Sequence, residues 1–263
     1  MKTILITGST DGIGFEAARR LLDGGHRVVL HGRSADKLAA RRQALAGPHG
    51  TPDGYVADLS DLDQVAQLAE TVATEVPSLD VLINNAGVFH HPAPRLANGI
   101  DIRFVVNTIA PYVLAQRLAP VLGPQGRVVN VSSAAQAPAD LDALAAGGTL
   151  SASAAYAQSK LAITAWTRRV AERGNGPLFV SVNPGSMLAS KMVKEAFGVA
   201  GRDIDIGAQI LERAALDPAF ADHAGAYFDN DSGQFAAPHP SALDDGHADA
   251  IIAAIDRVLG DAR

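Results

Sequence analysis

The sequence predicts an α/β fold in which a doubly wound, parallel seven-stranded sheet carries helices on both faces. Three observations lead to this prediction. Short runs rich in Val, Ile and Leu recur along the chain, bounded by Gly, Asn or Asp. Most of these runs are apolar at successive positions, as strands buried on both faces are. Longer segments with helical spacing lie between them, joined by short connections. One domain over residues 1–263 is expected.

Seven runs are expected to form the strands. In chain order they are Thr3–Thr7, Arg27–His31, Gly54–Ala57, Asp80–Asn84, Arg127–Val131, Leu178–Val182 and Gly225–Phe228. A helix is expected over Asp61–Val76, because its apolar residues fall on one face. Ser60, with Asp63 three residues later, forms an acceptable start for that helix. A further helical segment covers Phe104–Leu118.

Composition and charge exclude several classes of protein. The chain has 263 residues, no cysteine and a formal net charge of −6. The lack of cysteine excludes a disulfide scaffold, a thiolate metal site and a cysteine nucleophile. The acidic balance argues against nucleic acid as a partner. Apolar runs are too short for a signal-peptide core or a membrane span, so a cytoplasmic protein is expected.

A glycine-rich turn follows the first strand and leads into a helical pattern. It contains Gly8, Ser9, Thr10, Gly12, Ile13 and Gly14. A turn with few side chains lets backbone N–H groups approach an anion, and the helix N-terminus adds a partial positive charge. The spacing differs from the common G-x-G-x-x-G dinucleotide fingerprint. The turn therefore predicts a phosphate site, with a purely structural turn as the alternative.

Residues at the ends of the next strands point to the cofactor. Arg33 stands where NAD-selective sites carry an acidic residue, and a guanidinium binds a 2′-phosphate through paired hydrogen bonds. NADP(H) is therefore preferred and NAD(H) remains possible, although Asp11 counts against NADP and Arg33 could simply be solvated. Asp58, followed by Leu59, either accepts from an adenine amino group or caps the next helix. The run 84–87 fits a cofactor contact or an ordinary turn.

Tyr156 and Lys160 form the most informative pair, because residues four apart on a helix share a face. A phenol has a pKa of about 10, and a neighbouring ammonium is expected to lower it. The pair predicts a general acid/base for a carbonyl–alcohol couple, with a surface Tyr against a Lys stem as the alternative. Ser133 ends the fifth strand at the edge where ligands bind in such sheets. Asn107 lies in a helical segment, where Asn is unfavourable without a role, and Pro184-Gly185 can flank a planar ring.

These motifs occur in the order typical of the short-chain dehydrogenase/reductase family, which the chain resembles over residues 3 to about 190. The resemblance rests on T-G-x-x-x-G-I-G at 7–14, N-N-A-G at 84–87, Asn107, Ser133, Y-x-x-S-K at 156–160 and P-G at 184–185. It implies a Rossmann fold and an NAD(P)-dependent oxidoreductase that moves hydride between nicotinamide and a carbonyl or alcohol.

The resemblance also implies roles for the site residues. Tyr156 is the expected acid/base, Lys160 holds the nicotinamide ribose and lowers the tyrosine pKa, Ser133 orients the substrate, and Asn107 holds a water that relays protons. The residues expected to bind the cofactor are Gly8, Ser9, Thr10, Gly12, Ile13, Gly14, Arg33, Asp58, Leu59, Asn85, Ala86, Gly87, Tyr156, Lys160, Pro184 and Gly185.

Two segments depart from the common family pattern. An inserted loop at about 137–153 lengthens the interval between Ser133 and Tyr156, which resembles the retinol dehydrogenase-like branch. Residues 186–205 are expected to form a substrate lid, and the alternative is that they pack a helix onto the sheet. The lid contains the apolar residues Met187, Leu188, Met192, Val193 and Phe197, which favour an apolar ketone, aldehyde or alcohol as substrate.

The remaining polar clusters are not expected to bind metal ions. No metal is expected at His90-His91, or at His223 and His239. The run 229–233 resembles the start of a calcium loop, but Pro240 occupies the position of the required Glu, so a turn is expected.

The family implies a homo-oligomer, a dimer or tetramer through helices such as Ala154–Arg173, and the state is left open. Alternative functions are a non-catalytic NADP-binding sensor or scaffold and, third, an epimerase or dehydratase.

Overall fold

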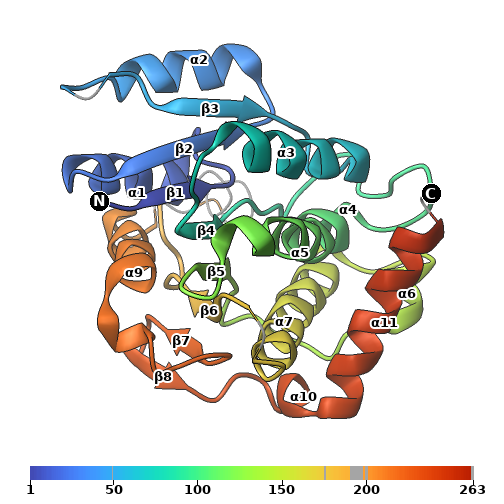
Figure 1. Ribbon diagram of the computed structural model, residues 1–263. Helices are drawn as coiled ribbons and strands as arrows, with labels where there is room; N and C mark the ends of the chain where they lie inside the picture. Colours follow the sequence, from blue (N-terminus) through green and yellow to red (C-terminus); the bar gives the residue numbers. More distant parts are fainter. Residues whose placement is uncertain (49, 175, 190–197, 199–200, 262–263) are drawn as a thin grey trace.

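The computed structural model describes residues 1–48, 50–174, 176–189, 198 and 201–261, and an eight-stranded sheet forms its centre (Figure 1). The strand order is β3-β2-β1-β4-β5-β6-β7-β8. The first seven strands run parallel, and β8 pairs antiparallel with β7. The strands are β1 Thr3–Ile6, β2 Arg27–Gly32, β3 Asp53–Val56, β4 Val81–Asn84, β5 Arg127–Val131, β6 Leu178–Asn183, β7 Tyr227–Asp229 and β8 Gln234–Ala236.

The prediction of a parallel sheet is confirmed, but its count of seven strands is corrected. The chain turns at Gly233, whose φ of +71° suits glycine, and returns as β8 beside β7. Phe235 on β8 packs against Phe228 on β7, with ring centroids 5.1 Å apart. A strand of three residues is too short to show an alternating pattern, so it was not predicted.

Helices cover both faces of the sheet, as predicted (Figure 1). One apolar core lies between the sheet and α3, α5, α7 and α11, and a second lies between the sheet and α1, α2 and α9. The helices are α1 Gly12–Asp23, α2 Ala35–Ala44, α3 Leu62–Glu75, α4 Ile102–Phe104, α5 Ala110–Leu122, α6 Leu141–Ala145, α7 Ala152–Ala171, α9 Asp205–Leu216, α10 Pro240–Leu243 and α11 Asp245–Asp261. A π-helix spans Val105–Ile109, and a 3₁₀ turn spans Pro218–Phe220.

Two local predictions about helices need correction. The cap of α3 is Asp61 rather than Ser60, because the Asp61 side chain accepts from the backbone N–H groups of Asp63 and Gln64. Ser60 donates instead to Asp58, which therefore orders the turn before the helix. The expected helix over Phe104–Leu118 is present, but its Val105–Ile109 stretch is a π-helix, a wide turn that is frequent at functional sites.

The two long segments differ in how much of them the structure describes. The inserted loop at 137–153 contains α6, which packs against α11. Of the expected lid, residues 190–197 and 199–200 lie outside the described residues, and these include Met192, Val193 and Phe197. Its described start contains Met187, which is 40% exposed, and Leu188, which is buried.

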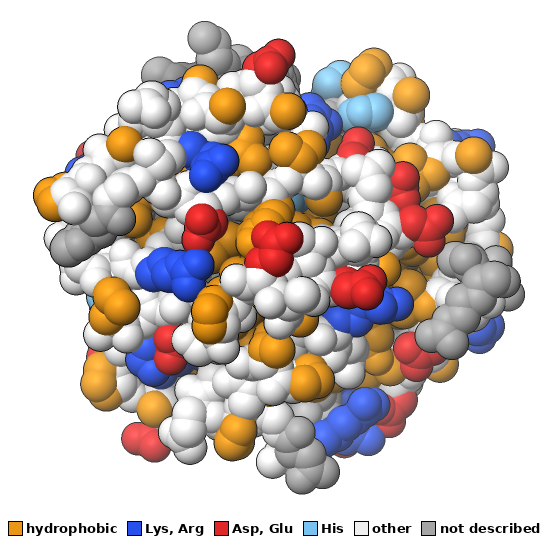
Figure 2. Space-filling view, turned by 45° about the horizontal axis from the view of Figure 1, so that its top comes forward, with side chains coloured by type: hydrophobic (Ala, Val, Ile, Leu, Met, Phe, Trp, Pro, Cys, Tyr) orange, Lys and Arg blue, Asp and Glu red, His pale blue; other side chains and the backbone are white. Residues whose placement is uncertain are grey.

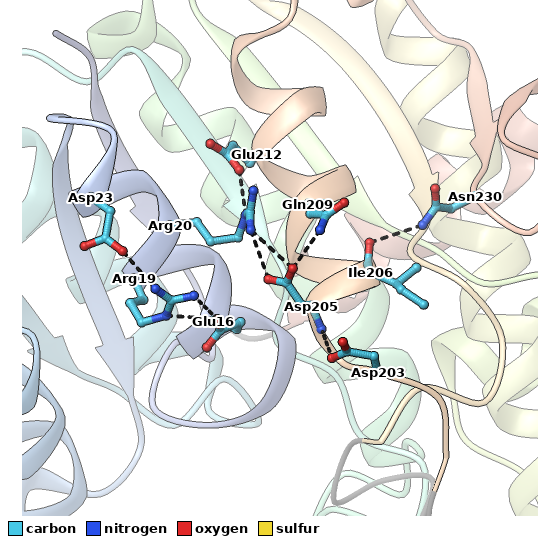
Figure 3. A network of polar contacts seen from close by, with 10 residues as sticks. All are labelled: Glu16, Arg19, Arg20, Asp23, Asp203, Asp205, Ile206, Gln209, Glu212 and Asn230. Carbon is cyan, nitrogen blue, oxygen red and sulfur yellow. Dashed lines mark hydrogen bonds and ion pairs between the residues drawn. The ribbon is translucent and has the colours of Figure 1, made fainter.

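The helix that follows the glycine turn is fixed to α9 by a polar network (Figure 3). Arg20 on α1 binds Asp205 at 3.1 Å and Glu212 at 2.7 Å, both on α9. Elsewhere on the surface, acidic and basic side chains are interspersed on the face shown in Figure 2. Within the described residues, no helix is long and apolar enough to cross a membrane. Among these described residues, no three His, Cys, Asp or Glu side chains are grouped so that they could hold a metal ion.

Candidate active site

A cleft of about 560 Å³ opens along the carboxyl ends of the parallel strands. Its centre lies between β1 and β4, where the strand order reverses and ligands bind in open α/β sheets. The expected site residues meet here although they come from segments far apart in the chain. All of them line the cleft except Ser9, Gly14 and Asn107, which are buried.

The glycine turn has a shape that side chains would prevent. Gly8 has a φ of +65°, and a Cβ there would lie 2.9 Å from the backbone Cα of Ala86. A Cβ on Gly14 would lie 2.6 Å from the carbonyl oxygen of Gly8. Asp11 caps α1 by accepting from the N–H of Gly12. The turn is therefore a bare backbone cradle at a helix N-terminus, as a pyrophosphate site requires.

His31 supports the turn from below, and sequence reasoning missed this role. Its Nδ1 accepts from the N–H of Gly8 at 3.1 Å, so Nε2 carries the proton and donates to Ala57 O at 3.1 Å. Burial lowers the pKa of His31 to about 4, so the ring is neutral near pH 7. The hydroxyl of Ser9, a residue expected at the cofactor, donates to His31 O and accepts from His31 N–H. A lone His in a strand run was the only signal for this contact.

Basic side chains flank one end of the cleft. Arg33 is exposed, and Lys37, one turn into α2, binds Asp11 at 2.6 Å. The hydrogen bond from Lys37 lowers the pKa of Asp11 and balances its charge. Arg41, a further turn along α2, donates to Thr10 O at 3.2 Å. Of these basic residues, only Arg33 was predicted from the sequence. Lys37 and Arg41 lie four residues apart, a spacing that places them on one side of a helix.

The segment after β4 is latched to β1. The Asn85 side chain donates to Thr7 O at 2.9 Å, and Thr7 Oγ1 accepts from the N–H groups of Asn85 and Ala86. Beneath it, the Asn84 side chain donates to Asn130 Oδ1 at 2.8 Å. The run 84–87 thus holds two strand ends together and still presents Asn85, Ala86 and Gly87 to the cleft.

Ser133, Tyr156 and Lys160 lie together at the other end of the cleft. Tyr156 and Lys160 project from α7, and the Lys160 Nζ lies 5.7 Å from the Tyr156 ring centroid. That Nζ donates to Val131 O at 2.6 Å, beside Ser133 at the end of β5. Ser133 in turn hydrogen-bonds the Tyr156 side chain. The predicted grouping of these three residues is thus present in the structure.

The expected effect of Lys160 on Tyr156 is corrected. Burial raises the pKa of Tyr156, and the hydrogen bond with Ser133 offsets only part of that rise. Burial also lowers the pKa of Lys160 to about 7, so an ammonium is only half formed near neutral pH. Desolvation is therefore the largest influence on the pKa of both groups.

Asn107 and Arg103 hold the wall beside Tyr156. Asn107 accepts from the N–H of Val88 at 2.8 Å and donates to Val88 O at 3.0 Å. Arg103, buried in an ion pair with Asp101, donates to Phe89 O at 2.6 Å. The Phe89 ring then lies 5.0 Å from the Tyr156 ring, centroid to centroid. The Asn107 side chain is thus engaged with protein groups, and its expected role as a water ligand remains untested.

Comparison with known proteins agrees with this arrangement. The short chain dehydrogenase family matches the chain over residues 2–198. A short-chain dehydrogenase, chry4, from Gibberella zeae is 28% identical over 99% of this chain and 98% of its own. Human retinol dehydrogenase 13 is 28% identical over 98% of this chain and 85% of its own. The crystal structure of a short chain dehydrogenase from Burkholderia cenocepacia in complex with NADP has a TM-score of 0.69 at 26% identity, covering 87% of this chain and 95% of that one.

Proposed function

Because the chain belongs to the short-chain dehydrogenase family of NAD(P)-dependent oxidoreductases, we propose that it transfers hydride between NADP(H) and an apolar carbonyl or alcohol, with Tyr156 as the acid/base. One observation carries the proposal. A single cleft joins the bare glycine cradle to the grouping of Ser133, Tyr156 and Lys160. A dinucleotide fits this layout, because its phosphates need backbone donors and its reactive ring must lie beside a proton donor.

The nicotinamide, when bound, supplies or accepts the hydride, and the protein manages the proton. In reduction, the Tyr156 hydroxyl donates its proton to the substrate oxygen, and Ser133 fixes that oxygen by a second hydrogen bond. Burial keeps Tyr156 protonated, so the acid form is ready at neutral pH.

Lys160 completes the proton path. With a pKa of about 7 it exists in both protonation states at neutral pH, so it can return a proton to Tyr156 after each turnover. Its Nζ is held by Val131 O, which keeps it on the Tyr156 side of the cleft. The pKa of Tyr156 and the pKa of Lys160 are both shifted mainly by burial.

The basic side chains support NADP over NAD. Arg33 and Lys37 line the cleft beside Thr10, on the side opposite the catalytic group. Lys37 also pairs with Asp11, the acidic residue that counted against NADP. Residues that would hold a 2′-phosphate are therefore Arg33 and Lys37, through charge-assisted hydrogen bonds.

The substrate end of the cleft supports an apolar ligand. Phe89, Ile102, Val106 and Met187 contribute apolar side chains to its lining. Ser133 and Tyr156 are then the polar groups that orient a reacting oxygen within this apolar part, a pattern that small-molecule sites commonly show. The two alternative functions are not favoured: a sensor would not need Ser133, Tyr156 and Lys160 grouped in the cleft, and the relatives are dehydrogenases rather than epimerases.

Cofactor selectivity tests this proposal. The measurements are Kd for NADPH and NADH, and NADPH oxidation with a panel of apolar ketones and aldehydes. Arg33→Ala should weaken NADPH binding about tenfold or more and leave NADH binding nearly unchanged, because only NADPH carries the extra phosphate. Arg117→Ala, on the exposed surface of α5, removes the same charge as a control. Equal losses for both cofactors would refute the NADP preference, and failure to bind either would refute the function.

A further inference from the structure

The geometry points to a role for the turn between β7 and β8: we propose that Asp231, with Asn230, is a positioning residue that fixes the Pro184–Ser186 backbone for the nicotinamide end of the cofactor. This inference rests on the proposed function. The turn lies beyond residues 2–198, the part of the chain that matches the family. It is also the run that resembled the start of a calcium loop, and its carboxylates have protein partners instead.

The Asp231 carboxylate collects donors from the end of β6 and from the segment after it. Ser186 donates its backbone N–H at 2.9 Å and its hydroxyl at 2.5 Å. Asn183 donates its side-chain amide at 3.0 Å. Arg202, from the far end of the expected lid, donates at 3.3 Å. Burial alone would raise the pKa of Asp231, but these donors outweigh it and hold that pKa below its ordinary range.

Asn230 holds the neighbouring residues of the same segment. Its side-chain amide donates to Pro184 O at 2.9 Å. The same amide donates to Ile206 O at 3.3 Å (Figure 3). Two adjacent side chains of one turn therefore bind Pro184 and Ser186, the residues on either side of Gly185. Ile206 belongs to α9, which Arg20 ties to the helix of the glycine turn.

The residue that follows the clamped segment, Met187, has a backbone conformation that residues other than glycine rarely adopt. Gly185 has a φ of +116° and Met187 a φ of +56°. Met187 is the only residue other than glycine with a positive φ in the described part of the chain. Such conformations persist only where surrounding contacts over-determine them, and they cluster at ligand sites. The clamped segment lines the cleft through Asn183, Pro184, Gly185, Ser186 and Met187.

The test compares the two halves of the cofactor. Asp231→Asn keeps the size of the side chain but loses its charge and one acceptor. We expect kcat/KM for carbonyl reduction to fall about tenfold or more and Kd for NADPH to rise severalfold. Kd for adenosine 2′,5′-bisphosphate, which lacks the nicotinamide, should stay within twofold of wild type. Hydrogen exchange of the Ser186 amide should speed up, because that N–H loses its charged acceptor.

Two further variants keep the test decisive. Asp222→Asn removes the same charge from an exposed position away from the cleft and should match wild type in every readout. Ser186→Ala removes one donor and no charge, so it should show a smaller loss in the same direction even if Asp231→Asn fails to fold. Wild-type kcat/KM in both clamp variants, or an equal loss of affinity for the bisphosphate, would overturn the positioning role. A wild-type protein that binds no dinucleotide would instead refute the proposed function, and the role with it.

Discussion

Replacing Lys160 with methionine should abolish activity and yet remove a cost to folding. Lys160 is 3% exposed, and burial lowers its pKa from 10.5 to about 7. At about 1.4 kcal/mol for each pH unit, that difference corresponds to at most about 5 kcal/mol of folding free energy below pH 7. The methionine variant escapes this cost but leaves Val131 O without its donor, a loss of about 1–3 kcal/mol that does not depend on pH.

The sign of the pH dependence follows from where the proton is held. Between pH 7 and 10.5 the unfolded chain keeps a proton on Lys160 that the folded chain has lost, so the unfolding free energy of wild type rises with pH. Relative to Lys160→Met, the rise from pH 7 to pH 10 should approach about 3 kcal/mol. Urea unfolding at each pH, followed by fluorescence of the single Trp166, measures it. A difference between the two proteins that stays constant with pH would refute the burial argument.

Three further predictions concern the scaffold around the site. Arg103→Met should lower the free energy of unfolding by about 3–5 kcal/mol in chemical denaturation, because it leaves the buried Asp101 charge unpaired. If the double variant Arg103→Met with Asp101→Asn loses as much stability, the unpaired charge is not the cause. Gly8→Ala should weaken NADPH binding at least about tenfold in a direct titration, since a Cβ would lie 2.9 Å from Ala86 Cα; unchanged affinity would exclude the cradle. Helix α7 should not form a subunit interface, because α10 and α11 of the same chain pack against it, and the chain should therefore sediment as a monomer. A dimer that can be cross-linked through α7 would contradict this prediction.

The fold was predictable because its signals are local. Seven strand runs were recognisable from buried apolar residues at successive positions, and each appears in the sheet within a residue or two. The short β8 was missed because three residues carry no period. The cap of α3 was misplaced by one residue because Ser60 and Asp61 are both good caps. The contacts decide between them, since Asp61 accepts from the N–H groups of Asp63 and Gln64 while Ser60 donates to Asp58.

The candidate site was predictable where a motif carries its own chemistry. Tyr156, Lys160, Ser133 and the glycine turn were found from spacing and resemblance, and the structure brings them to one cleft. Their supports could not be found in that way. His31 reaches Gly8 from a strand 23 residues away. Asp231 reaches Ser186 from 45 residues away, and such pairs exist only after the sheet has formed.

The expected lowering of the Tyr156 pKa failed for a related reason. Spacing alone places the charge of Lys160 near Tyr156, whereas folding also removes water from around both side chains. Burial penalises the phenolate and the ammonium alike, and its extent cannot be read from the spacing of two residues.

The most direct measurement is a single-turnover comparison of wild type with Tyr156→Phe. The protein is loaded with NADPH, mixed with an apolar ketone or aldehyde, and followed by the loss of nicotinamide absorbance. We expect the variant to bind NADPH within about threefold of wild type but to reduce the carbonyl at least about a hundredfold more slowly, because only the proton donor is missing. Turnover by Tyr156→Phe at the wild-type rate would exclude Tyr156 as the acid/base.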